Sequence, residues 1–202
     1  MGLCGCDHCR PVDIARAVST LTVMPLQPRP RPTLFLDCDH VIADPTPGAT
    51  AFDRLRPACV ARLDGLVTAT GCRVVLSSTW RQTFTPRSLC AVLAQRGYRG
   101  TVDDATPLLA GVTRGAEIRA WLDAHPGEVD GYVVLDDWPA SEFAGMVGHL
   151  VTTDPDAGLT DHDVARVVAM FAAQRVESAR RAFMAGHEAT ARRAVVGRVV
   201  AA

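Results

Sequence analysis

Short apolar runs alternate with longer amphipathic stretches between residues 33 and 171. Five runs have strand length: TLFLDCD (33–39), CRVVLSST (72–79), GTVDDATP (100–107), GYVVLDD (131–137) and GHLVTTD (148–154). Between them, helical spacing of apolar residues predicts helices over 51–71, 86–98 and 114–126. Continuously apolar strands that alternate with helices are typical of a parallel sheet with both faces covered. We therefore predict an α/β, Rossmann-like fold with about five parallel strands and helices on both faces.

Acidic side chains and a serine follow three of these strands. Asp37 and Asp39 follow the first strand, Ser77 the second, and Asp136 and Asp137 the fourth. In open parallel sheets the ligand crevice lies at the carboxyl ends of the strands, so these side chains should meet there. Carboxylates that converge need a cation or a shared proton. An all-oxygen set suits a hard divalent cation, and Mg²⁺ is the usual choice beside phosphate.

Three more residues complete a candidate phosphate site. Arg114, just before the helix GAEI, can neutralise a phosphate oxygen with its planar guanidinium. Ser77 and Ser78 offer hydroxyl groups, although Ser78 also suits a turn. Together with the acids, these are the parts that phosphoryl transfer requires. The alternative is that the aspartates serve only turns and helix caps.

Four segments in order resemble the motifs of the haloacid dehalogenase (HAD) superfamily of phosphohydrolases. DCDHVI resembles its first motif, VVLSS the second, Arg114 stands in the place of the third, and VVLDD resembles the fourth. The resemblance covers roughly residues 33–171 and is closest to small HAD domains of bacterial and phage proteins, some fused to RNA-repair enzymes. It departs at His40, where Gly is common in the superfamily.

The resemblance implies a role for each motif residue. Asp37 would be the nucleophile that forms an aspartyl-phosphate, and Asp39 the general acid and base. Mg²⁺ would bind the Asp37 carboxylate, the Asp39 main-chain carbonyl and Asp136, with Asp137 a direct or water-mediated ligand. Phosphate would be held by the remaining motif residues, which are Ser77, Ser78 and Arg114.

The spacing of the motifs leaves no room for a sizeable cap domain. Segment 39–77 holds little beyond one helix and its loops, and segment 77–114 holds one helix and one short strand. The crevice should therefore be open, and its expected rim consists of His40, Trp80, Arg81 and Trp138. The last three can contact a base or a second phosphate, but packing is the favoured interpretation for them. An open site with aromatic side chains can admit a nucleic-acid end, with a nucleotide as the next choice.

Two other functions remain open at this stage. A receiver-like signalling module also accepts a phosphoryl group on Asp, but it normally needs a Lys, and every basic residue here is Arg. A catalytically silent HAD-like scaffold could bind a partner through the Arg-rich C-terminal segment.

Composition limits location and partners. A net charge of −1 gives no general attraction to nucleic acid or membranes, and no apolar run reaches the ~18 residues of a membrane span. Scattered cysteines and the absence of a signal-peptide pattern indicate a cytoplasmic protein.

Domain organisation follows from the same patterns. We expect an N-terminal extension with a Pro/Arg linker (1–32), a catalytic domain (33–174) and a helical extension (175–202) with a break near Gly186. An apolar face of Val164, Val167, Val168 and Phe171 should dock the last helix on the domain. The N-terminal segment also contains possible zinc ligands, Cys4, Cys6, His8 and Cys9, but incidental thiols are the favoured interpretation.

Overall fold

The computed structural model describes residues 29–200, with side chains described up to residue 187 except residue 186. The possible zinc ligands Cys4, Cys6, His8 and Cys9 lie outside these residues, as does most of the expected N-terminal extension. Within the described part of the chain, no helix is long and apolar enough to span a membrane.

The described residues form one five-stranded, fully parallel sheet in the order β3-β2-β1-β4-β5. Its strands are β1 (Arg31–Leu36), β2 (Arg73–Leu76), β3 (Asp104–Ala105), β4 (Val129–Asp136) and β5 (Leu150–Thr152). The α/β prediction and each of the five expected strands are confirmed. Because the order reverses on either side of β1, the crevice between β1 and β4 is the expected ligand position.

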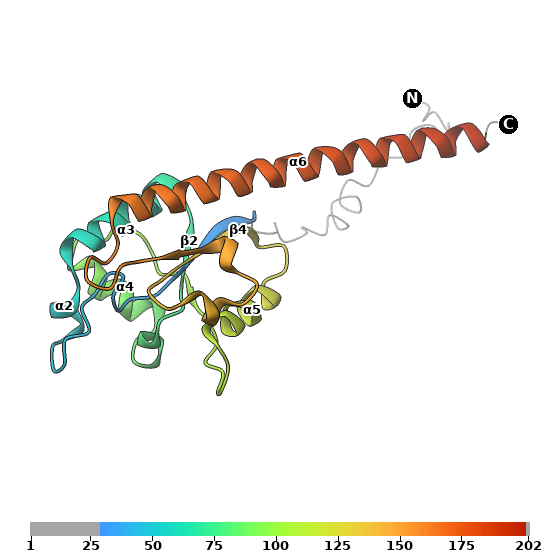
Figure 1. Ribbon diagram of the computed structural model, residues 1–202. Coiled ribbons are helices and arrows are strands. Elements are labelled where there is room, and N and C mark those ends of the chain that lie inside the picture. The colour runs from blue at the N-terminus through green and yellow to red at the C-terminus, as the bar shows by residue number, and fades with distance from the viewer. Residues whose placement is uncertain (1–28, 201–202) are drawn as a thin grey trace, which may run out of the picture.

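Helices cover both faces of the sheet (Figure 1). The α-helices are α2 (Ala51–Arg54), α3 (Pro57–Thr70), α4 (Pro86–Ala94), α5 (Arg114–Ala124) and α6 (Asp161–Val200). Short 3₁₀ helices are η1 (Thr79–Gln82), η2 (Ala140–Phe143) and η3 (Val147–His149). No cap domain interrupts the connections from β1 to β2 or from β2 to α5, as predicted.

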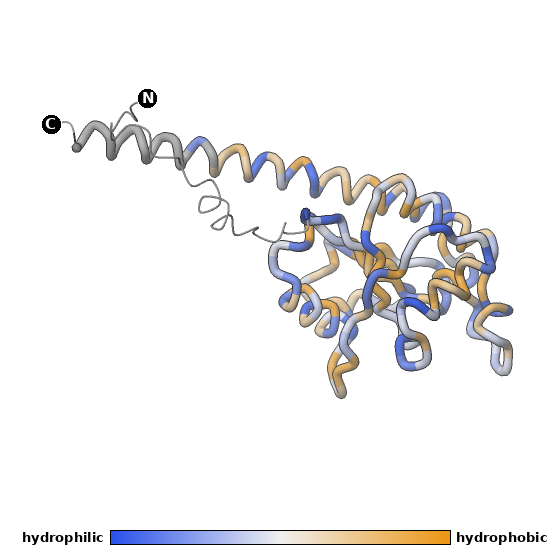
Figure 2. The backbone as a smooth tube through the Cα atoms, turned by 180° about the vertical axis from the view of Figure 1, so that it is seen from behind, coloured by the Kyte–Doolittle hydropathy of each residue, from blue (hydrophilic) through white to orange (hydrophobic). Residues whose placement is uncertain are grey.

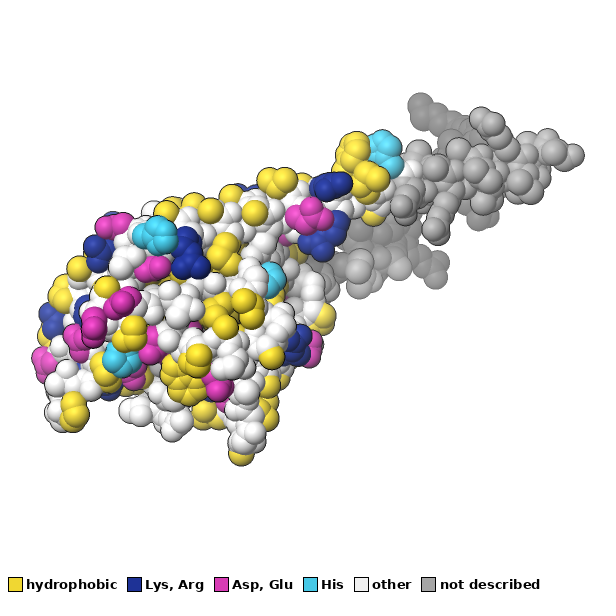
Figure 3. Space-filling view, viewed as in Figure 1, with side chains coloured by type: hydrophobic (Ala, Val, Ile, Leu, Met, Phe, Trp, Pro, Cys, Tyr) yellow, Lys and Arg dark blue, Asp and Glu magenta, His cyan; other side chains and the backbone are white. Residues whose placement is uncertain are grey.

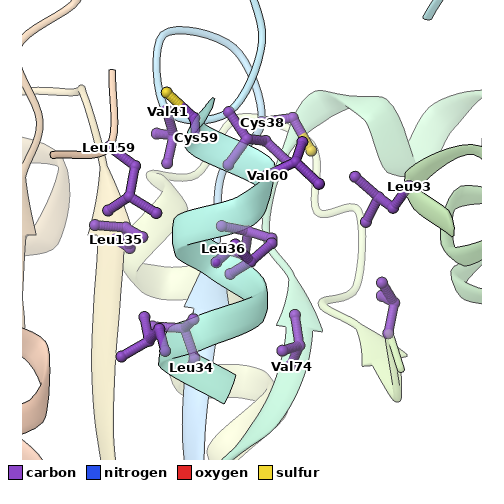
Figure 4. Close-up of a cluster of buried hydrophobic side chains, with 14 of the residues drawn as sticks. Leu34, Leu36, Cys38, Val41, Cys59, Val60, Val74, Leu93, Leu135 and Leu159 are labelled. Carbon is purple, nitrogen blue, oxygen red and sulfur yellow. The ribbon is translucent and has the colours of Figure 1, made fainter. Parts of the chain in front are cut away.

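Alternating residues of β1 build the two halves of the core. Leu34 and Leu36 point to one face, where α3, α4 and α6 pack over them, and Figure 4 shows Val60 of α3 in this cluster. Phe35 points to the other face and packs against Trp121 of α5. Both faces of the central strand are therefore dry, and the strand ends are held at fixed positions.

The predicted helix over 51–71 is two helices. Pro57 has no N–H to donate and disfavours the helical conformation at the residue before it, so α2 ends at Arg54 and α3 begins at Pro57. The end of α3 is as predicted, because Gly71 takes a left-handed conformation with φ 63°.

The start of the last helix is capped, and its docked face differs from the prediction at one residue. The Oγ1 of Thr160 accepts from the Asp163 amide (3.2 Å) and the Asp163 carboxylate accepts from the Thr160 amide (3.1 Å), a capping box. Val167 and Phe171 are buried, whereas Val168 is 37% exposed and does not belong to the docked face.

The expected break at Gly186 is wrong, because α6 runs through it to Val200 and projects well beyond the sheet (Figure 1). Hydrophobic side chains are exposed along this projecting part (Figure 3), among them Val176 and Phe183. The boundary expected at residues 174 and 175 falls inside this helix and stays a prediction.

Three loops extend from the carboxyl edge of the sheet, on the side away from α6 (Figure 1). They span residues 44–50, 77–85 and 106–113. The third is strongly hydrophobic along its length (Figure 2), with Leu108, Leu109 and Val112 exposed. These loops surround the strand ends that carry the predicted chemistry.

Candidate active site

Parallel pairing brings the predicted acids together. Asp37 directly follows β1 and donates its amide to the Leu135 carbonyl (3.0 Å), while Asp136 ends the adjacent strand β4. Asp37, Asp136 and Asp137 each offer a carboxylate oxygen, and these three atoms lie within 4.8 Å of one another. The cluster therefore stands at the switch point between β1 and β4.

Arg114 bridges two of these acids. It is the first residue of α5, and its side chain is only 5% exposed. Its Nη1 lies 2.7 Å from Asp37 Oδ1 and 2.6 Å from Asp136 Oδ2. The guanidinium carbon is 4.2 Å from the centre of the Trp138 ring, which holds the cation from the other side. Arg114 thus supplies one positive charge to the buried acids.

The single positive charge of Arg114 does not balance the negative charge of this cluster. Burial raises the pKa of the Asp37 carboxyl to about 7, the charge of Asp136 adds to the rise, and Arg114 acts against it. Burial also raises the pKa of Asp136, although Arg114 opposes that rise. The carboxylates are therefore short of positive charge at neutral pH.

The donor set fits Mg²⁺. The three clustered carboxylates provide hard oxygen ligands without nitrogen or sulfur. Asp136 is fully buried, with Oδ1 accepting from the Trp138 amide (3.0 Å) and Oδ2 from Arg114. Asp137 is half-buried and lines the central cavity, and no described residue donates a hydrogen bond to its carboxylate. Asp137 thus presents the freest carboxylate of the three.

Asp39 is held apart from this cluster. Its Oδ2 accepts from the indole Nε1 of Trp80 (3.1 Å), and its Oδ1 forms an ion pair with Arg54 at the end of α2. The Arg54 guanidinium also stacks over Trp80, 5.0 Å from the ring centre. The side chain of Asp39 is therefore fixed at the edge of the crevice, two residues from Asp37 but turned toward different partners.

A tight turn after Asp37 makes this separation possible. The Cys38 carbonyl accepts hydrogen bonds from the amides of Ile42 and Ala43, both at 2.9 Å. His40 has φ 57°, the left-handed conformation that explains why Gly is common at this place. Its ring Nδ1 lies 3.3 Å from the Pro155 carbonyl, which anchors the strained residue.

The two serines have different surroundings. Ser77 is fully buried, and its Oγ has no hydrogen-bond partner among the described residues. Ser78 Oγ accepts from the Trp80 amide (3.3 Å) and caps η1, so it serves the turn. An oxygen of a bound ligand could accept the hydrogen bond that this buried hydroxyl at the end of β2 lacks.

The expected rim residues divide into two groups. Trp138 is 41% exposed and half-buried His40 lines the cavity, so both are accessible at the mouth. Trp80 is buried beneath Asp39, and the Arg81 guanidinium is buried in an ion pair with Glu117. Arg81 also donates to the carbonyls of both serines, so it supports the loop that follows β2.

A small cavity and two larger pockets form the crevice. The central cavity, about 230 Å³, is lined by Asp37, Asp39, Asp137 and Arg114, among others. One flanking pocket, here the Phe84 pocket, has about 400 Å³ and is lined by Asp39, Ala51, Arg54, Trp80, Thr83 and Phe84. The other, the Leu109 pocket, has about 410 Å³ and is lined by Arg81, Gln82, Leu108, Leu109, Ala110, Val112, Arg114, Glu117 and Trp138. Thr79 borders all three, and each larger pocket shares a further residue with the central cavity, Asp39 for the Phe84 pocket and Trp138 for the Leu109 pocket.

Fold and site together define a HAD-type domain, phosphatase-like in the general sense of that superfamily. Residues 33–164 match the family model for the HAD domain in Swiss Army Knife RNA repair proteins, and the chain belongs to this family. The match covers more than half of the chain and all of the clustered acids. A comparison with curated proteins gives no match to this sequence.

Sequence reasoning missed two residues at the site, Arg54 and Glu117. Arg54 lies 15 residues from Asp39 and belongs to no motif, and only the packing of α2 against the crevice brings the two together. The same is true of Glu117, whose pairing with Arg81 depends on how α5 packs.

Proposed function

We propose that the protein is a Mg²⁺-dependent phosphatase that works through an aspartyl-phosphate on Asp37, with phosphorylated nucleic-acid ends as its substrates. The observation that carries the proposal is the buried cluster of Asp37, Asp136 and Asp137 at the switch point, with Asp39 held separately beside it. Asp37, Asp136 and Asp137 would hold Mg²⁺ together with the Asp39 main-chain carbonyl. When bound, the ion would supply positive charge to the phosphoryl oxygens and to the carboxylates.

The first half-reaction transfers the phosphoryl group to the protein. The Asp37 carboxylate attacks phosphorus, the bond from phosphorus to the leaving oxygen breaks, and Asp39 gives its proton to that oxygen. Arg114 donates to a non-bridging phosphoryl oxygen from beside Asp37, and the free hydroxyl of Ser77 donates to another.

The second half-reaction releases phosphate. Asp39, now ionised, takes a proton from water, and the water oxygen attacks phosphorus. The bond between phosphorus and the Asp37 oxygen breaks, which returns the carboxylate. The two fixed donors on Asp39, Trp80 Nε1 and Arg54, keep its carboxylate in one place through both steps.

Nucleic-acid ends are favoured by the open crevice and the family. Residues 29–200 contain no cap domain that could enclose a small metabolite, and Trp138, which is 41% exposed, stands at the mouth of the cavity. The family to which the chain belongs is described from RNA repair proteins. A nucleotide is the second choice of substrate.

Phosphate release from an aryl phosphate tests the catalytic part of this proposal. We expect turnover with Mg²⁺, none with EDTA, and none for Asp37→Asn. A protein that binds Mg²⁺ but releases no phosphate from any aryl, nucleotide or oligonucleotide substrate would favour the silent HAD-like scaffold.

A second assay tests the substrate. We expect a higher kcat/KM for 3′- or 5′-phosphorylated oligonucleotides than for the matching mononucleotide. A clear preference for the mononucleotide or a sugar phosphate would refute nucleic-acid ends as the substrates and leave the proposed phosphatase activity intact.

A further inference from the structure

The central cavity is too small for a whole substrate. Its volume of about 230 Å³ lies below the ~300 Å³ at which pockets for entire small molecules begin. The cavity therefore takes the phosphoryl group, and the remainder of the substrate must extend into a flanking pocket. Which pocket receives it is a question that rests on the proposed function, because it depends on the role of Asp39.

The position of Asp39 decides between the two pockets. A general acid must lie within ~2.6–3.2 Å of the oxygen that it protonates, so the leaving group has to pass beside the Asp39 carboxylate. Asp39 lines both the central cavity and the Phe84 pocket, but it does not line the Leu109 pocket. Its carboxylate is turned toward Arg54 and Trp80, which line the Phe84 pocket as well. We propose that the Phe84 pocket binds the leaving nucleoside of the substrate.

The lining of the Phe84 pocket suits a nucleoside. Its volume of about 400 Å³ falls in the range of small-molecule pockets. Phe84 is half-buried and fixed against Trp80, with ring centres 5.7 Å apart, so it offers a rigid aromatic surface for a base. Arg54 is paired with Asp39, but its side chain stays 23% exposed, against 5% for Arg81 and for Arg114, so it can still meet the next phosphate of the substrate.

The Leu109 pocket has the opposite character. Leu108, Leu109 and Val112 are exposed and apolar. Glu117 already accepts from Arg81 and from the Leu109 amide (3.0 Å), and the Arg114 charge is shared between two acids. This pocket therefore offers a phosphodiester chain little positive charge.

A matched pair of charge insertions tests the assignment. Thr83 is exposed and lines the Phe84 pocket, and Val112 is 47% exposed and lines the Leu109 pocket. Thr83→Glu and Val112→Glu each add one carboxylate on a surface loop, and both variants should melt like the wild type. The quantity to compare is kcat/KM for a phosphorylated oligonucleotide divided by kcat/KM for an aryl phosphate.

We expect Thr83→Glu to lower this ratio at least tenfold at low salt, because the new charge repels the phosphodiester chain. The loss should shrink as salt is added, since the interaction is solvent-exposed. Val112→Glu should leave the ratio within twofold of the wild type.

Every other pattern contradicts the assignment. If Val112→Glu lowers the ratio and Thr83→Glu does not, the leaving group lies in the Leu109 pocket. Equal effects of the two variants on the ratio, or no effect of either, would mean that the leaving group is confined to neither pocket. A wild type that cleaves aryl phosphate but no oligonucleotide overturns this inference while the phosphatase stands, and a wild type with no phosphatase activity overturns the proposed function itself.

Discussion

The charge imbalance around Asp37 predicts a pH-dependent gain in stability for Asp37→Asn. In the folded, metal-free protein the pKa of Asp37 is raised from an ordinary 3.8 to about 7 by burial and by Asp136. The folded state therefore holds a proton that the unfolded state releases between about pH 4 and pH 7. Stability falls as the pH rises through this window, and the cost is complete above pH 7. Asparagine at this position has no proton to lose and escapes the cost.

The size of the effect follows from the same values. Each pH unit within the window is worth about 1.4 kcal/mol, which sets a ceiling of about 4 kcal/mol for the whole window. Between pH 5 and pH 8 the stability of Asp37→Asn should rise relative to the wild type by about 2.5 kcal/mol. Any constant difference in stability that comes from the lost Arg114 contact cancels, because only the change with pH is used. For a chain of this size, about 2.5 kcal/mol corresponds to roughly 5–10 °C in Tm.

Thermal unfolding in EDTA at several pH values measures this effect. Asp123→Asn is the matched control, because Asp123 is exposed and lies on α5 away from the cluster. Added Mg²⁺ should stabilise the wild type more than Asp37→Asn, since the ion neutralises the charge that the variant lacks. A difference between Asp37→Asn and wild type that stays constant from pH 5 to pH 8 would refute the electrostatic reasoning.

Three further predictions address single side chains. Asp137→Asn should raise the Mg²⁺ concentration for half-maximal activity about tenfold with an unchanged Tm, because its carboxylate lines the cavity and accepts no hydrogen bond from a described residue. An unchanged Mg²⁺ titration would count against its role as a ligand. Arg54→Gln should lower kcat on an aryl phosphate about tenfold with little change in KM, because Arg54 positions Asp39. Arg54→Lys keeps the positive charge and should recover part of the lost kcat. An equal loss for both variants would point to a merely structural role. The free energy of unfolding of His40→Gly, measured in urea, should lie within about 0.5 kcal/mol of the wild-type value. His40→Val should lose more than about 1 kcal/mol of this free energy, because a β-branched residue fits φ 57° poorly. Similar free energies for the two variants would contradict the backbone explanation.

The sequence was sufficient for the sheet and for the acids at its edge. Apolar runs of strand length are a local signal, and parallel strands end at one edge, so the meeting of Asp37 and Asp136 follows from the order of elements alone. Pro57 also carries a local signal, and the break between α2 and α3 was predictable from it. The order of the motifs further predicted Asp37 as the nucleophile and Asp39 as the general acid and base.

The partners of these residues were not predictable in the same way. The contact of Arg54 with Asp39 and that of Arg81 with Glu117 join segments 15 and 36 residues apart, and both depend on how a helix packs. From the sequence, Arg81 and Trp80 were expected at the rim of the crevice for the same reason as Trp138, because all three follow a strand. Burial separates them, and burial depends on the whole fold.

The loops at residues 44–50, 77–85 and 106–113 have a consequence for how such a domain diversifies. The acids stand on the rigid ends of β1 and β4, whereas most of the lining of the two flanking pockets comes from these loops and from α2. Surface loops tolerate insertion and exchange far better than strands do. Changes in loop length and composition can therefore alter which ligands the flanking pockets accept, while the geometry of the acidic cluster stays the same.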